Sequence, residues 1–171
     1  MGGEAQVVAL RPGSEAAEEA GTHTVPRPLR MLPLAGLDRV GVVLVSHSRV
    51  VAEAVAAMAV ELLGSGDPAP TATAGSMPED GLGTGPALVA AAAREVDQGM
   101  GVAVIADLDA SVGTVRGVLA AAEAHGLPFP VRLADAPFVE GAVAAVATAS
   151  AGGDLSAVIE AAEDCYVVRK L

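Results

Sequence analysis

Short aliphatic runs alternate with longer segments of helical periodicity between residues 40 and 163, and this alternation restricts the folds open to the chain. The runs VGVVLV, at residues 40–45, and GVAVIA, at residues 101–106, contain no polar residue, and each precedes a helical pattern. Such strands are typical of parallel sheets that helices cover on both faces. We therefore predict an α/β fold with a doubly wound, mainly parallel sheet and helices on both faces.

Capping and turn signals place the remaining elements. Ser48 can cap the helix that follows the first strand, and the Gly-Ser-Gly sequence at 64–66 can end that helix. Thr84 can cap the next helix. Further helices are predicted at 111–124, 139–149 and 155–163, and further strands at 70–74 (a weak edge strand), at 129–133 and, as a short last strand, at 166–168.

The first part of the chain differs in composition from the rest. Residues 1–38 have no periodic apolar pattern and mix Gly, Pro and acidic residues, so we expect a disordered tail before one domain at 39–171. Only 2% of the chain is aromatic, and Ala and Val supply most of its apolar residues. Because a core of small side chains buries less area per residue, burial at a subunit interface would compensate, and we expect a homodimer.

Charge and cysteine content exclude several classes of partner. The net charge is −11 and Lys170 is the single lysine, so no basic stripe is available to neutralise phosphates and nucleic acid is not an expected partner. An acidic surface instead favours docking to a basic protein face. The single cysteine, Cys165, excludes an internal disulfide and fits a reducing cytoplasm. No apolar run is long enough to predict a membrane span.

Two polar residues with reactive side chains lie at the carboxyl ends of predicted strands. His47 comes after the first strand, and Asp107 comes after the strand at 101–106. Because ligands of open α/β sheets collect at the carboxyl ends of strands, these positions suggest that the two side chains meet. A carboxylate could then accept a hydrogen bond from one ring nitrogen and leave the other as a nucleophile. The alternative is a structural role, in which His47 is a polar strand terminus bonded to a neighbouring carbonyl group.

Other chemistries fit the sequence less well. Ser46 and His47 are adjacent and would point to opposite sides of an extended chain, which argues against a serine hydrolase. No second histidine stands at ligand spacing from His47, so no metal site is expected. The loop GLGTG, at 81–85, does not continue into a P-loop or match a dinucleotide fingerprint. His125, near a predicted helix end, is interpreted as a solvated residue.

Four segments together resemble a known family. They are VGVVLVSHSRVVAEAV, EDGLGTGPALVAAA, GVAVIADLDAS and LADAPFVEGAVAAVATASAGGDL, in this order along the chain. In this order they are similar to the phosphocarrier subunits of phosphoenolpyruvate-dependent dihydroxyacetone kinases (the DhaM family). These subunits belong to the mannose-type EIIA proteins of the phosphotransferase system. The resemblance covers nearly all of residues 40–162.

The resemblance implies a phosphotransferase role and a homodimer. His47 would accept a phosphoryl group from phospho-HPr and pass it to ADP on the nucleotide-binding subunit of the kinase. The resulting ATP would phosphorylate dihydroxyacetone on the substrate-binding subunit. Asp107 would orient the His47 ring, and the transient phosphoryl group on His47 would be the only group carried, with no bound cofactor. By the same match, the residues lining the site would be Ser46, Ser48, Asp80, Gly81, Gly83, Thr84, Leu108, Asp109 and Ser111.

The chain departs from the family pattern beside the expected site. Asp109 stands where the family tends to have glycine, and Thr114 stands where it tends to have asparagine. Asp109 would bring a second negative charge near an incoming phosphate and oppose its binding unless it points outward. These departures leave open a regulatory or scaffold homologue that is no longer phosphorylated. A mannose-type EIIA component of a sugar permease is a second alternative, within the same class of phosphocarriers.

Overall fold

A computed structural model of the chain describes residues 38–64, 66–76 and 84–168. The predicted tail at 1–38, apart from its last residue, and the predicted site residues Asp80, Gly81 and Gly83 lie outside the described residues. The described part contains one parallel sheet, with the strand order β2-β1-β3-β4. Its strands are β1 (Gly41–Val45), β2 (Thr71–Ala74), β3 (Val102–Ala106) and β4 (Val131–Leu133).

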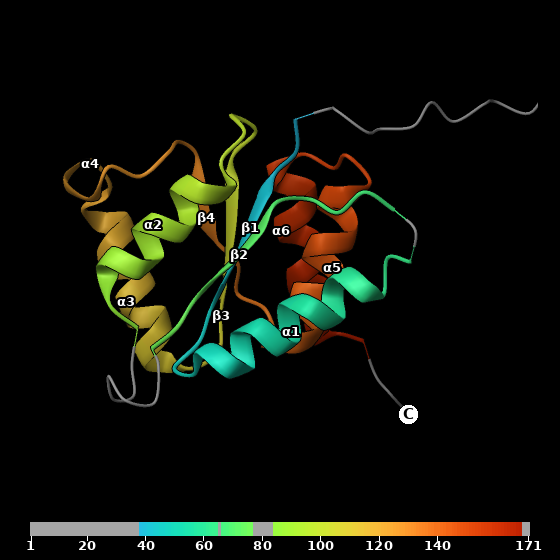
Figure 1. Cartoon of the computed structure of the whole chain (residues 1–171), viewed down its shortest axis with the longest axis horizontal. Helices are drawn as coiled ribbons and strands as arrows, with labels where there is room; N and C mark the ends of the chain where they lie inside the picture. Colours follow the sequence, from blue (N-terminus) through green and yellow to red (C-terminus); the bar gives the residue numbers. More distant parts are fainter. Residues whose placement is uncertain (1–37, 65, 77–83, 169–171) are drawn as a thin grey trace, which may run out of the picture. The chain divides into compact units, whose positions relative to one another are not determined.

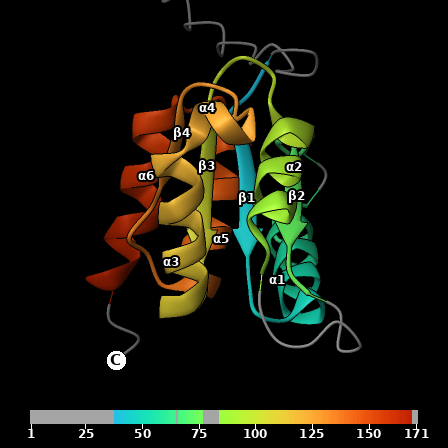
Figure 2. The same ribbon diagram turned by 90° about the vertical axis from the view of Figure 1, so that its left-hand side faces the viewer.

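Helices cover both faces of this sheet, which confirms the predicted fold class (Figures 1 and 2). Along β1, alternate side chains enter opposite layers of the core: Val42 and Leu44 belong to one cluster, and Val43 and Val45 belong to the other. The first layer contains α1 (Arg49–Glu61), α5 (Phe138–Ser150) and α6 (Leu155–Glu163), and the second contains α2 (Pro86–Val96) and α3 (Asp109–Ala120), with α4 (Ala122–His125) beyond it.

Small residues let the chain pass closely around the carboxyl end of β1. A Cβ atom on Gly75, just after β2, would lie 2.8 Å from the backbone nitrogen of Arg49, the first residue of α1. Only glycine therefore fits between β2 and the start of α1. The backbone N–H of Arg49 also donates to the carbonyl of Ser76, at 3.2 Å. These contacts fix the segment that joins β1 to α1, which carries His47.

The structure corrects one predicted strand. Residues 166–168 form no strand; instead the 3₁₀ helix η2 (Asp164–Tyr166) continues the winding of α6, and the Val167 N–H donates to the Asp164 carbonyl at 3.1 Å. The side chains of Tyr166, Val167 and Val168 are mostly exposed. The apolar run was therefore not a sign of burial in a sheet within this domain.

Other helices and strands begin or end a few residues away from their predicted bounds. The edge position of β2 is confirmed, but β4 begins at Val131, because Phe129 is 92% exposed and lies outside the sheet. Helix α3 begins at Asp109, two residues earlier than predicted, and the backbone at Ala121 (φ −116°, ψ 36°) separates it from α4. Among the described residues, no helix is long and apolar enough to cross a membrane.

Candidate functional site

The candidate site lies where the strand order reverses. The chain leaves β1 toward β2 on one side, and β3 pairs with β1 on the other side, in a register that sets Val45 opposite Ala106. Ser46 and His47 continue from Val45, and Asp107 continues from Ala106, so parallel pairing brings them to one edge of the sheet. This is the position at which doubly wound folds place their ligands.

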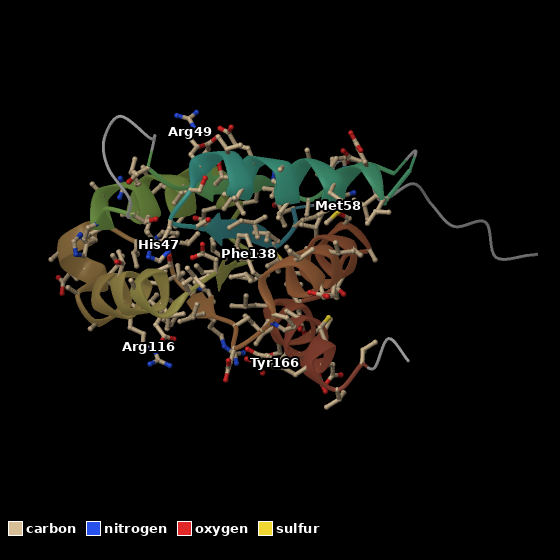
Figure 3. The ribbon with its side chains drawn as sticks, turned by 90° about the horizontal axis from the view of Figure 1, so that it is seen from below. His47, Arg49, Met58, Arg116, Phe138 and Tyr166 are labelled. Carbon is tan, nitrogen blue, oxygen red and sulfur yellow. The ribbon has the colours of Figure 1, made fainter. Side chains whose placement is uncertain are left out.

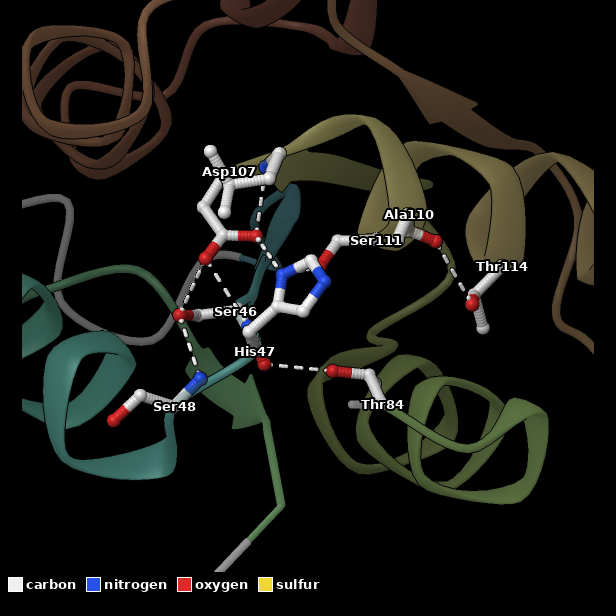
Figure 4. Close-up of polar contacts among 9 residues, drawn as sticks. Ser46, His47, Ser48, Thr84, Asp107, Ala110, Ser111 and Thr114 are labelled. Carbon is white, nitrogen blue, oxygen red and sulfur yellow. Dashed lines mark hydrogen bonds and ion pairs between the residues drawn. The ribbon is translucent and has the colours of Figure 1, made fainter. Parts of the chain in front are cut away.

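The Asp107 carboxylate accepts several of the hydrogen bonds at this edge of the sheet (Figure 4). Its Oδ1 atom lies 3.2 Å from the His47 ring nitrogen Nδ1, and its Oδ2 atom accepts from the His47 backbone N–H at 3.1 Å. The Ser46 hydroxyl donates to Oδ2 at 2.8 Å. The Ser111 hydroxyl lies 3.0 Å from the same ring nitrogen, Nδ1. The structure thus brings together His47 and Asp107, as their places in the sequence suggested, and adds a second contact to the ring.

The groups around Asp107 keep it as a charged acceptor. Burial would raise its pKa, but hydrogen bonds from Ser111, Ser46 and the amide and ring of His47 outweigh burial, so the pKa of Asp107 lies below its ordinary value. Because a carboxylate only accepts hydrogen bonds, the facing nitrogen Nδ1 is placed to donate. Within the described part of the chain, Nε2 makes no hydrogen bond, and the His47 side chain is 24% exposed. The arrangement favours a ring whose Nε2 lone pair is free to react.

The peptide between Ser46 and His47 is held at both ends. Its carbonyl accepts a hydrogen bond from the Thr84 hydroxyl at 2.6 Å, and its N–H donates to Asp107. The sequence predicted that Thr84 caps α2, but the N-cap residue is Gly85. The Thr84 hydroxyl donates to the Ser46 carbonyl at the site instead. Ser48 is the N-cap residue of α1, but its side chain makes no capping bond, and its N–H donates to the Ser46 hydroxyl at 3.1 Å.

A cleft of about 630 Å³ opens beside the His47 ring. The start of α3 forms one wall, and the segment at 134–136 together with Tyr166 forms another. In Figure 3 the His47 ring lies between the start of α1 and α3, whereas the Arg116 side chain extends outward from α3. The residues that line the cleft include His47, Asp107, Leu108, Asp109, Arg116, Asp135 and Tyr166.

Asp109 lies in this cleft because α3 begins there. It is the first residue of the helix, it is exposed, and it makes no hydrogen bond or ion pair with any other described residue. A carboxylate at a helix N-terminus is favourable to the helix. The same carboxylate adds negative charge to the cleft wall near His47. In this position Asp109 would oppose the binding of an incoming phosphate, as the sequence predicted.

Three polar residues that line the cleft, Arg116, Asp135 and Tyr166, were not predicted from the sequence. Asp135 follows β4 with one residue between, so the strand-end argument that found Asp107 could also have found it. Arg116 and Tyr166 carry no such signal, because their positions depend on how α3 and η2 pack. His125 ends α4, which lies at the opposite end of the sheet from the carboxyl end of β1 (Figure 2). No cluster of three or more metal-ligating side chains occurs among the residues that the structure describes.

A comparison with protein families identifies the family of the chain. Residues 41–159 match the family model EIIA-man, described as the PTS system fructose IIA component. The chain belongs to this family. The matched range of this EIIA-man domain includes β1, β3 and both His47 and Asp107. EIIA domains are phosphotransferase-system components that interact with HPr and other proteins of that system.

A solved structure shares the fold of this EIIA-man domain. The crystal structure of the unknown-function protein EF1359 matches with a TM-score of 0.59 and 24% identity. The match covers 74% of this chain and 94% of that chain. At this identity the likeness supports the fold alone. No curated protein matches the chain.

Proposed function

We propose that this EIIA-man domain is a phosphohistidine carrier: His47 takes a phosphoryl group from phospho-HPr and passes it to ADP on the nucleotide-binding subunit of a dihydroxyacetone kinase. The observation that carries the proposal is the pair of contacts on Nδ1, from Asp107 and Ser111, which leave Nε2 without a hydrogen bond to any described residue on a ring that lines the cleft. A phosphoryl carrier needs such an oriented and accessible nucleophile near neutral pH.

The transfer steps follow from this orientation. The Nε2 lone pair attacks the phosphorus atom of the donor's phosphohistidine, a P–N bond forms on His47, and the donor's P–N bond breaks. The His47 ring then carries positive charge, which the Asp107 carboxylate stabilises from the Nδ1 side. In the second step, an oxygen of the ADP β-phosphate attacks the same phosphorus atom, and the P–N bond to His47 breaks. Positioning and charge stabilisation are the main contributions that a protein makes to such steps.

The choice of acceptor rests on sequence motifs. The Ser-His-Ser sequence at 46–48 and the Ala-Pro-Phe-Val-Glu-Gly sequence at 136–141 support the dihydroxyacetone kinase over a sugar permease. The second candidate acceptor is a permease component, which the description of the matched family as a fructose IIA component also fits. We further propose that the domain acts as a homodimer and holds no cofactor apart from the phosphoryl group on His47.

Reconstitution separates these candidates. Phosphoenolpyruvate, enzyme I, HPr and this chain are combined with the two other kinase subunits, and formation of dihydroxyacetone phosphate is followed. Formation that depends on this chain supports the proposal. Transfer to a permease component in place of the kinase would make the chain a sugar-transport EIIA. If HPr is phosphorylated but the chain is not, the chain is a homologue that kept the fold without the transfer.

Neutralising Asp109 is expected to speed phosphoryl acceptance. The Asp109→Asn variant removes a negative charge from the cleft wall near the incoming phosphoryl group, and we expect an acceptance rate about two- to fivefold higher at low salt. The measurement is the rate of label transfer from phospho-HPr at low and high ionic strength, with the gain shrinking as salt rises. Glu123→Gln is the matched control, since Glu123 lies on α4. An Asp109→Asn rate equal to or below the wild-type rate would remove Asp109 as an obstacle.

Removing the Thr84 hydroxyl is expected to slow transfer without weakening donor binding. The Thr84→Val variant loses the hydrogen bond to the Ser46 carbonyl and loosens the peptide that carries the His47 N–H. We expect about a three- to tenfold lower transfer rate at saturating phospho-HPr. Thr71→Val is the control, because the Thr71 hydroxyl also donates to a backbone carbonyl, that of Ala69. Equal rates for the two variants would show that the Thr84 contact is unimportant.

A further inference from the structure

Arg116 differs from the other arginines that the structure describes. Each of the others makes a hydrogen bond or an ion pair within the chain; they are Arg39, Arg49, Arg94 and Arg132. Arg116, an exposed residue of α3, makes neither with any described residue. Its positive charge is therefore not used within the described part of the chain and is available to a ligand.

The position of Arg116 relates it to the candidate site. It lines the cleft beside the His47 ring, and it is the one arginine or lysine among the described residues that do so. Three carboxylates also line this cleft, those of Asp107, Asp109 and Asp135. Because carboxylates repel an anionic ligand and a guanidinium stays charged at any physiological pH, Arg116 is the side chain of the cleft best suited to attract one.

The spacing along α3 sets the reach of Arg116. Asp109, Val112 and Arg116 all line the cleft, so they lie on one face of the helix. The Ser111 hydroxyl contacts the His47 ring, which places the ring beside the first turn of α3. Arg116 lies further on by about 7 Å along the helix axis, and its side chain extends outward from α3 in Figure 3. Because helical side chains lean toward the helix N-terminus, its guanidinium can approach a group just beyond the reacting atoms.

We propose that Arg116 is a substrate-binding residue of the second transfer step, in which its guanidinium binds the α-phosphate of the ADP acceptor. The inference rests on the proposed phosphocarrier function and adds a residue to it. An oxygen of the ADP β-phosphate attacks the phosphorus atom on His47, the P–N bond breaks, and its electron pair returns to Nε2. Arg116 gives up no proton in this step; it holds the adjacent phosphate through charge-assisted hydrogen bonds.

The two partners of His47 differ in the charge that they bring to the cleft. Phospho-HPr delivers a single phosphoryl group, and that group ends bonded to His47. ADP brings a second phosphate, joined to the attacking one and lying further from the ring. With Asp109 and Asp135 among the lining residues, this second phosphate is stabilised only if a cation lies nearby. An arginine beyond the ring therefore serves the acceptor step more than the donor step.

Single-turnover delivery tests the proposal. The chain is phosphorylated with phosphoenolpyruvate, enzyme I and HPr, separated from them, and mixed with rising concentrations of the nucleotide-binding kinase subunit carrying ADP. ATP formation is followed by rapid quench. We expect Arg116→Ala to lower the delivery rate at saturation about ten- to hundredfold, and to lower acceptance from phospho-HPr by no more than about threefold. Arg116→Lys, which keeps the charge, should recover most of the delivery rate.

Arg132→Ala is the matched control. Arg132 is an exposed arginine of β4 and does not line the cleft of His47. Its delivery rate is expected to equal the wild-type rate. Delivery by Arg116→Ala at the wild-type rate would overturn the proposal, and so would an equal loss in both transfer steps, which would indicate a structural role. A higher half-saturating concentration with a normal rate at saturation would also overturn it, because Arg116 would then contact the kinase subunit and not the reacting nucleotide.

The same experiment separates this inference from the proposed function. A wild-type chain that is not phosphorylated, or that is phosphorylated but forms no ATP, would end the assignment of the kinase as acceptor and the role of Arg116 with it. Wild-type delivery matched by Arg116→Ala would remove the role of Arg116 alone.

Discussion

The His47→Ala variant is expected to fold normally and to accept no detectable phosphoryl group from phospho-HPr. Among the described histidines, His47 is the one at the carboxyl end of β1. Its Nε2 atom is the proposed nucleophile, and its Nδ1 atom contacts Asp107, which orients the ring. The ring is partly exposed and makes polar contacts, so its loss leaves both core layers intact. The measurement is intact-protein mass spectrometry after incubation with phosphoenolpyruvate, enzyme I and HPr.

His125→Ala is the matched control for this experiment. His125 ends α4, and its backbone carbonyl, not its ring, accepts from Arg94 at 2.7 Å. This variant should take up the phosphoryl group as the wild type does. Full acceptance by His47→Ala, together with loss in His125→Ala, would move the phosphorylation site away from the cleft.

The Asp107→Asn variant is expected to slow phosphoryl acceptance by roughly 10²- to 10⁴-fold, the range seen when an orienting carboxylate beside a catalytic histidine becomes an amide. Asp107 accepts from the Ser46 hydroxyl, the His47 amide and the Leu108 amide. An asparagine can accept through one atom only and must turn its NH₂ group toward other donors or toward Nδ1. An NH₂ group facing Nδ1 would favour the proton on Nε2 and remove the nucleophile.

Rapid-quench transfer from labelled phospho-HPr measures this loss. Asp135→Asn is the control, because Asp135 lines the same cleft and its contact is with the Tyr166 hydroxyl, at 3.4 Å. We expect its rate to stay within about threefold of the wild-type rate. If Asp107→Asn transfers as fast as Asp135→Asn, the contact with Nδ1 does not contribute to the chemistry.

The architecture could be predicted because its signals are local. The aliphatic runs that form β1 and β3 are continuous, since parallel strands covered on both faces need apolar residues throughout. Helix α6 has its predicted bounds, because Asp154 caps it by accepting from the Ala157 N–H at 2.9 Å. The apolar residues at 166–168 misled because the run alone cannot show whether a neighbouring strand is available.

The pairing of His47 with Asp107 was also accessible from sequence. Parallel strands end at the same edge of the sheet, so polar residues that follow two neighbouring strands lie close together. The family resemblance listed Thr84 and Ser111 among the residues that line the site, but the hydrogen bonds that each makes there could not be predicted from the sequence. Each depends on where α2 or α3 begins, and a shift of one or two residues decides whether a hydroxyl caps the helix or reaches the site.

The most direct measurement of the central claim is the location of the phosphoryl group on the wild-type chain. The protein, labelled with ¹⁵N, is phosphorylated by phosphoenolpyruvate, enzyme I and HPr, and the bonded nitrogen is identified by phosphorus and long-range nitrogen NMR. We expect one acid-labile phosphoryl group on Nε2 of His47, with the proton retained on Nδ1 beside Asp107. A phosphoryl group on Nδ1 or on another residue, or none while HPr is phosphorylated in the same tube, would contradict it.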